Sequence, residues 1–183
     1  MSIDHIVYAA SEPVAQTQLR EHALAAGWQV AFFDGSYEDL DELAPDGDLA
    51  SCGDIIGWRA SAFDRGLFED LVRANDIARV KHLIEEGTIG WCSLACGEFS
   101  AIDEYGDDEE IDEEWEDLAD YIRTCTYEYN VYGSSWHNEV SHDLRSALQW
   151  SLWILTRGYM EDANFNQRLY ETDPHRDQPV VPS

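Results

Sequence analysis

One stretch restricts what this chain can fold into more than any other, because its charge needs a solvated face. Between Asp103 and Asp120, twelve of the eighteen residues are Asp or Glu. No Lys or Arg occurs from His82 to Ile122, and this window holds −15 of the net charge of −27. Burying unpaired carboxylates is costly. Any interpretation of this chain must therefore account for a concentrated acidic segment.

The acidic segment has the apolar pattern of a helix. Its apolar residues recur at spacings of four, three, four, three and four, which places them on one helical face: Ile111, Trp115, Leu118, Ile122, Cys125 and Tyr129. Asp107 or Asp108, following Gly106, stands where an N-cap belongs. The remaining faces carry most of the carboxylates, including Glu109, Glu110, Glu113, Glu114, Asp117 and Asp120. The sequence therefore predicts an amphipathic helix with an acidic outer face.

Two interpretations of this acidic face stay open. Acids in a first helical turn interact favourably with the helix dipole, and a charged face keeps a helix solvated. However, pairs such as Glu109–Glu113 and Glu113–Asp117 place like charges four residues apart. Each such pair destabilises a helix by about 0.2–0.5 kcal/mol. A helix that needed only solubility would interleave Lys, so the face is also interpreted as a binding surface.

The rest of the sequence predicts one α+β domain over residues 1–170, with a flexible C-terminal tail over 171–183. The expected sheet is small, mixed or antiparallel, with about four helices packed on it. Strands are expected at 3–9, 28–33, 54–60 and 88–99, the last with a possible bulge at Gly97. Helices are expected at 11–26, at 63–86 with a break near Asn75, and at 139–159. A hydrophobic content of 44% over 183 residues suffices for a core.

Charge and composition exclude several classes of protein. No run reaches eighteen apolar residues, and the N-terminus lacks a basic region, so no membrane span or signal peptide is expected. A pI near 4.1 argues against direct binding of nucleic acid or anionic lipid. The four cysteines, Cys52, Cys92, Cys96 and Cys125, are expected to be reduced thiols of a cytoplasmic protein.

Motifs for catalysis are weak. Glu139 and His142 form one E-x-x-H pair on the last predicted helix, with His137 nearby, whereas di-iron bundles use two such pairs. Neither a Walker A nor a G-x-G-x-x-G motif occurs, and Gly133-Ser134-Ser135 lacks the trailing glycine of a nucleophile elbow. The sequence assigns no catalytic residue and no cofactor, and it favours an interaction protein over an enzyme.

The preferred hypothesis is therefore an acidic interaction module that binds a basic protein, with Trp115 as an apolar anchor. The partner could be a toxin, a nuclease or a nucleic-acid-binding protein, and the module an inhibitor, an immunity-type protein or a nucleic-acid mimic. One alternative is a metal-binding protein or enzyme centred on Glu139, His142 and His137. Another is a soluble domain from an acidic, halophile-like proteome.

Overall fold

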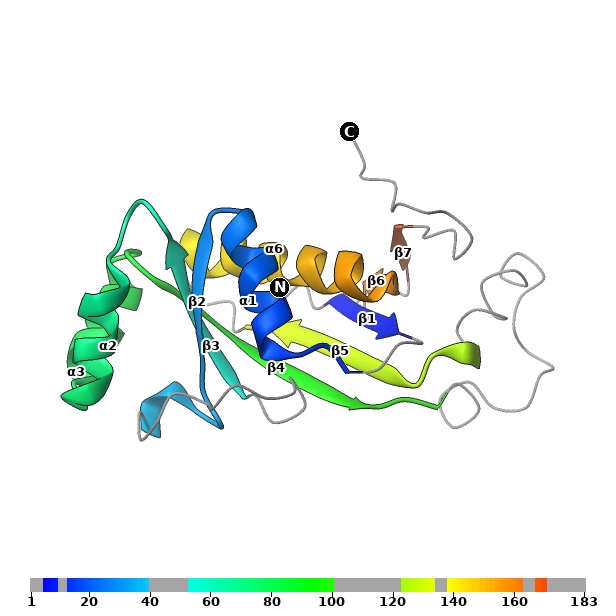
Figure 1. Ribbon diagram of the computed structural model, residues 1–183, viewed down its shortest axis with the longest axis horizontal. Coiled ribbons are helices and arrows are strands. Elements are labelled where there is room, and N and C mark those ends of the chain that lie inside the picture. The colour runs from blue at the N-terminus through cyan, green and yellow to red at the C-terminus, as the bar shows by residue number, and fades with distance from the viewer. Residues whose placement is uncertain are drawn as a thin grey trace.

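The computed structural model describes residues 5–9, 13–39, 53–100, 123–133, 138–162 and 167–170. These residues form an α+β fold, as the sequence predicts, with one seven-stranded antiparallel sheet of order β2-β3-β4-β5-β1-β6-β7 (Figure 1). The strands are β1 (His5–Ala9), β2 (Trp28–Phe32), β3 (Asp54–Arg59), β4 (Gly90–Glu98), β5 (Tyr127–Tyr132), β6 (Tyr159–Asp162) and β7 (Gln167–Tyr170). The described helices are α1 (Gln16–Ala25), α2 (Arg65–Arg73), α3 (Ile77–Glu85), α6 (Glu139–Thr156) and a short 3-10 helix, η1 (Tyr37–Asp39).

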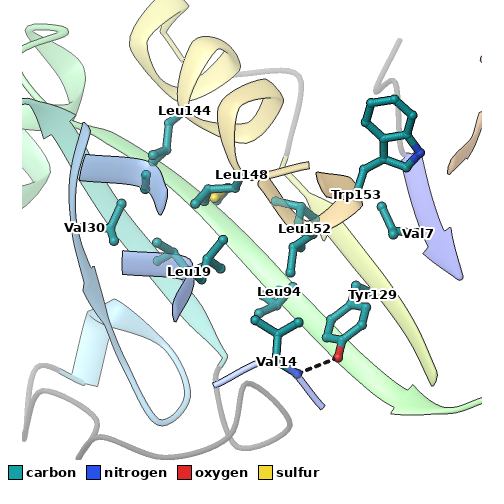
Figure 2. Packing of buried hydrophobic residues seen from close by; sticks show 14 of the residues in the cluster. Val7, Val14, Leu19, Val30, Leu94, Tyr129, Leu144, Leu148, Leu152 and Trp153 are labelled. Atoms are coloured by element: carbon teal, nitrogen blue, oxygen red, sulfur yellow. Dashed lines mark hydrogen bonds between the residues drawn. The ribbon is translucent and has the colours of Figure 1, made fainter. Parts of the chain in front are cut away.

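Helices α1 and α6 pack on one face of the sheet and enclose the larger core. Successive side chains of a strand point to opposite faces, so alternate residues such as Val30 and Phe32 of β2 face these helices. On α6 the spacing of four residues aligns Leu144, Leu148 and Leu152 along one stripe (Figure 2). All three leucines are fully buried, so α6 is the central helix of this core.

The helices α2 and α3 cover the opposite face at the β2–β3 end of the sheet (Figure 1, left). Residues one position out of phase with the first core face these two helices, including Ile56 and Trp58 of β3. The ring centroids of Trp58 and Phe68 of α2 lie 4.7 Å apart. The predicted break between the two helices is confirmed at Asn75, which has a φ of 52°.

Two glycines let α6 approach the sheet closely. Gly57 of β3 and Gly90 of β4 are cross-strand partners in the register. A Cβ atom on Gly90 would lie 2.8 Å from the backbone nitrogen of Ser141 and from the backbone oxygen of Val140. A Cβ atom on Gly57 would collide with Leu144. The first turns of α6 therefore rest directly on these two strands.

Asn138 fixes the start of α6 in three directions. Its Oδ1 atom accepts a hydrogen bond from the backbone nitrogen of Ser141 at 2.7 Å, as an N-cap does. Its Nδ2 atom donates to the backbone oxygen of Ile89 at 3.2 Å and also to that of Ile84. One side chain thus joins α6 to the end of α3 and to the start of β4.

The predicted start of the first helix is wrong. The helix is expected over residues 11–26, but α1 begins at Gln16. Val14 and Ala15 stay outside the helix because other groups bind their backbone nitrogens. Val14 donates to the Tyr129 hydroxyl and Ala15 donates to the side chain of Gln18.

The predicted C-terminal elements also need correction. The last helix was expected to reach Tyr159, but α6 ends at Thr156 and Arg157 adopts a left-handed conformation with a φ of 51°. Tyr159 begins β6, and neither β6 nor β7 was predicted. No bulge occurs at Gly97, which pairs with Glu128 in a regular register. Residues 171–183 lie outside the described residues, so the flexible tail stays a prediction.

Within the described part of the chain, no helix combines the length and apolar character needed to cross a bilayer.

Candidate functional site

The acidic segment connects two neighbouring strands of the sheet. Strand β4 ends at Glu98, β5 begins at Tyr127, and these two residues are direct cross-strand partners. Beyond them, the backbone nitrogen of Phe99 donates to the backbone oxygen of Thr126 at 2.9 Å. Residues 100–125 are therefore an insertion whose two ends lie side by side, here called the acidic insertion.

The base of the acidic insertion is part of the folded core. Phe99 is buried, and its ring centroid lies 4.7 Å from that of Tyr8 on β1. Cys125 is also buried, and the backbone nitrogen of Thr126 donates to the backbone oxygen of Ala9. Contacts with β1, β4 and β5 thus fix the positions of the two ends of the insertion relative to the sheet.

The predicted partner-binding residues lie outside the described residues. They are Glu109, Glu110, Glu113, Glu114, Trp115, Asp117 and Asp120, and they stay predictions. Arg123 and Thr124, the first two described residues after Ser100, are helical. The predicted apolar face runs too far, however, because Cys125 follows the helical residues and Tyr129 lies on β5.

Most basic side chains in the first half of the chain already have acidic partners. The ion pairs are Arg59–Asp143 at 3.5 Å, Arg65–Glu69 at 2.8 Å, Arg73–Asp70 at 2.6 Å and Lys81–Glu38 at 2.7 Å. All four pairs are exposed, so each contributes little to stability. Their consequence is electrostatic, because each base neutralises a carboxylate outside the insertion and does not offset the charge of the insertion.

Tyr129 is the centre of a buried polar contact that the sequence did not reveal. Its side chain is fully buried, and its hydroxyl accepts a hydrogen bond from the backbone nitrogen of Val14 at 2.9 Å (Figure 2). Cys96 on β4 is the direct cross-strand partner of Tyr129. Burial raises the pKa of Tyr129 to about 12, so the phenol is neutral at physiological pH. The hydrogen bond therefore links β5 to Val14, just before the start of α1.

Asp54 forms a second polar cluster on the α2–α3 face. Its carboxylate is buried and accepts hydrogen bonds from the Ser93 hydroxyl at 2.7 Å and from the backbone nitrogen of Tyr37 at 2.8 Å. Burial, followed by the nearby charge of Glu38, raises the pKa of Tyr37. The Ser93 hydroxyl donates to a carboxylate rather than to a histidine, so this pair anchors η1 and lacks the base of a nucleophilic triad.

The metal-binding alternative gains no further ligands in the structure. Glu139 and His142 are both exposed on the first turn of α6, and His137 lies outside the described residues. Across the residues that can be described, no group of three or more His, Cys, Asp or Glu side chains could hold a metal ion. Among the described cysteines, Cys92 and Cys125 are buried and Cys96 is half-buried, and none of the three is in a disulfide. The metal site stays a prediction, which elemental analysis of protein purified without chelator would check.

Two polar residues that the sequence did not single out lie in the core. Gln16 is fully buried on α1, and Arg145 on α6 is 8% exposed. A helical pattern gives a signal for Arg145 in retrospect, because it lies four residues from both Ser141 and Gln149, which are also buried.

Comparisons of the chain with protein-family models, curated proteins and solved structures found no match.

Proposed function

We propose that this protein is an acidic interaction module that binds the basic surface of another protein through its acidic insertion. The observation that carries the proposal is the charge of the insertion. Residues 100–125 include twelve acidic residues and a single base, Arg123, and they connect two hydrogen-bonded strands. Residues 100–125 take no part in the pairing of β4 with β5, so their composition can serve binding.

The physical role of the charge is to guide association. A surface of one sign attracts a partner of opposite sign before contact, raises the association rate and repels partners of like charge. The complementary surface is basic, such as the nucleic-acid groove of a nuclease, a toxin or a nucleic-acid-binding protein. The module then acts as an inhibitor or immunity-type protein, or as a mimic of nucleic-acid phosphates. Trp115 is the proposed apolar anchor among these charges.

The test compares wild-type protein with a four-site variant in which Glu110, Glu113 and Glu114 become Gln and Asp117 becomes Asn. Both proteins are used for affinity capture from the native cell, and the captured proteins are identified by mass spectrometry. A basic protein should be captured by the wild type and lost with the variant. Its binding should also weaken as salt rises, because exposed charges are screened beyond about 8 Å at physiological ionic strength.

A matched control removes the same charge elsewhere. Glu21, Asp34, Glu85 and Glu86 are exposed carboxylates outside the insertion, and their Gln or Asn variants should retain capture. The insertion variant should also melt higher by about 2–4 °C, because it relieves three like-charge pairs worth together about 1 kcal/mol on the predicted helix. A lower melting temperature with capture intact would refute the proposal. Equal loss of capture in both variants would show that capture depends on the net charge of the protein and not on the insertion.

A further inference from the structure

Arg145 is a buried cation on the central helix. It is 8% exposed, and its Nε atom is enclosed without a hydrogen-bond partner. Within the described residues it forms no ion pair, whereas Arg59, Arg65, Arg73 and Lys81 pair at the surface. Arg145 therefore differs from these four paired bases in both its burial and its lack of an ion pair among the described residues.

Two hydrogen bonds define where Arg145 lies. Four residues before it, the hydroxyl of Ser141 accepts from the backbone nitrogen of Trp91 on β4 at 3.0 Å. Four residues after it, the Nε2 atom of Gln149 donates to the backbone oxygen of Val131 on β5 at 3.0 Å. Residues four apart share a helical face, so Arg145 lies over β4 and β5 between these two contacts.

No carboxylate of the described chain balances this charge. Glu139 and Asp143 on the same helix are exposed, and Asp143 pairs with Arg59. Asp54 lies on the opposite face of the sheet, bound by Ser93 and Tyr37. A guanidinium stays protonated in proteins, so burial of this group is not relieved by loss of its charge. An uncompensated buried cation is strongly unfavourable, so the site is suited to an added anion.

We propose that Arg145 anchors a binding site for a small oxyanion, namely a carboxylate, phosphate or sulfate group. The guanidinium is a planar donor that binds two oxygen atoms of such a group in parallel. The 8% exposure limits the ligand to a small group, and the net charge of −27 repels polyanions such as nucleic acid.

Thermal unfolding of the full chain tests the site. Wild-type protein is melted with millimolar sodium phosphate or sodium acetate, against sodium chloride at equal ionic strength. At about a hundred times the dissociation constant, the melting temperature should rise by about 5–10 °C. The rise should disappear in Arg145→Met, and Arg145→Lys should retain part of it. Arg79→Met, which removes an exposed arginine of α3, should respond like the wild type.

The two anions separate the possible sources of the ligand. A response to phosphate alone indicates a free tetrahedral anion, and a response to acetate as well indicates a carboxylate such as a peptide terminus. Isothermal calorimetry of phosphate and acetate with wild-type protein gives a readout that does not depend on the folding of the variants. Equal melting in all three salts together with no heat of binding would overturn the proposal. An unchanged anion response in Arg145→Met would also overturn it.

Discussion

Replacing Gly90 with Ala is expected to displace the start of α6 from the sheet. The added Cβ would lie 2.8 Å from the backbone nitrogen of Ser141 and the backbone oxygen of Val140, where ordinary contacts begin near 3.4 Å. The overlap of about 0.6 Å involves backbone atoms, which cannot rotate away as a side chain can. Relief therefore requires α6 to move, and Asn138 and Ser141 tie it to its neighbours.

The expected cost follows from that rigidity. Overpacking a close contact costs about 1–3 kcal/mol, and the upper part of this range applies where no side chain can yield. For a chain of this size each kcal/mol lowers the melting temperature by about 2–4 °C. Gly90→Ala should therefore melt about 4–12 °C below the wild type, as measured by circular dichroism or calorimetry.

The same substitution on the same strand provides the control. A Cβ on Gly97 would have Glu128 Oε1 as its nearest neighbour, at 3.9 Å, so Gly97→Ala should change stability by less than about 0.5 kcal/mol. Equal melting temperatures for the two variants would refute the close approach of α6 to β4. A crystal structure of Gly90→Ala should show the first turns of α6 moved outward.

Three further predictions concern the buried polar groups and the insertion. Tyr129→Phe leaves the Val14 backbone nitrogen without its acceptor, which should lower the free energy of unfolding at neutral pH by about 1–3 kcal/mol in urea titrations. The folded-state pKa of about 12 exceeds the ordinary 10, so the unfolded chain loses this proton first. Wild-type stability should therefore fall from pH 10 to 12 by roughly 2–3 kcal/mol more than that of the Phe variant, and parallel profiles would contradict the assignment. Gln16→Met removes a fully buried amide whose two polar atoms lack partners, so it should stabilise the protein by about 1 kcal/mol; a loss of stability would show that the amide is bonded. Replacing residues 101–122 by a four-residue Gly-Ser linker should preserve the sheet while changing the net charge from −27 to −15, because twelve acids and no base are removed. Shortening the closed loop favours folding by about 1 kcal/mol, and loss of cooperative unfolding would show that the core needs the insertion.

Local sequence patterns predicted the elements whose signals are strong over a few residues. The strands near 28–33 and 54–60 were predicted to within one residue, since each is a short apolar run after a turn. The break between α2 and α3 was predicted near Asn75, and it occurs there because Asn tolerates the left-handed conformation that Asn75 adopts. The α+β class followed from the number and order of these segments.

The errors arose where contacts distant in sequence decide the structure. Tyr129 fits the helical spacing that begins at Ile111, yet β5 pairs with β4 and β1 on both sides, and these pairings override a local period. The helix α1 begins late because a tyrosine more than a hundred residues away binds Val14. Strands β6 and β7 have four residues each, too few for a reliable pattern.

For the candidate site too, some features could be predicted from the sequence and others are visible only in the structure. Composition alone located the acidic insertion, but only the strand register shows that its ends meet at Phe99 and Thr126. The burial of Arg145 has no signature in composition, because Arg is common on the exposed faces of helices. Its position becomes visible only when Ser141 and Gln149 are known to contact the sheet.

The place of β1 in the sheet has a consequence for how the chain is made. Val7 pairs with Tyr129 on one side and with Met160 on the other, so β1 is synthesised more than a hundred residues before either of the strands that flank it. Strands β2, β3 and β4 are consecutive neighbours and can associate as soon as they emerge. Pairings between distant segments are slow to form, since the loop between them must first close. During synthesis β1 therefore cannot pair until β5 and β6 have been made, and its insertion between them is expected to be the late, rate-limiting step of sheet formation.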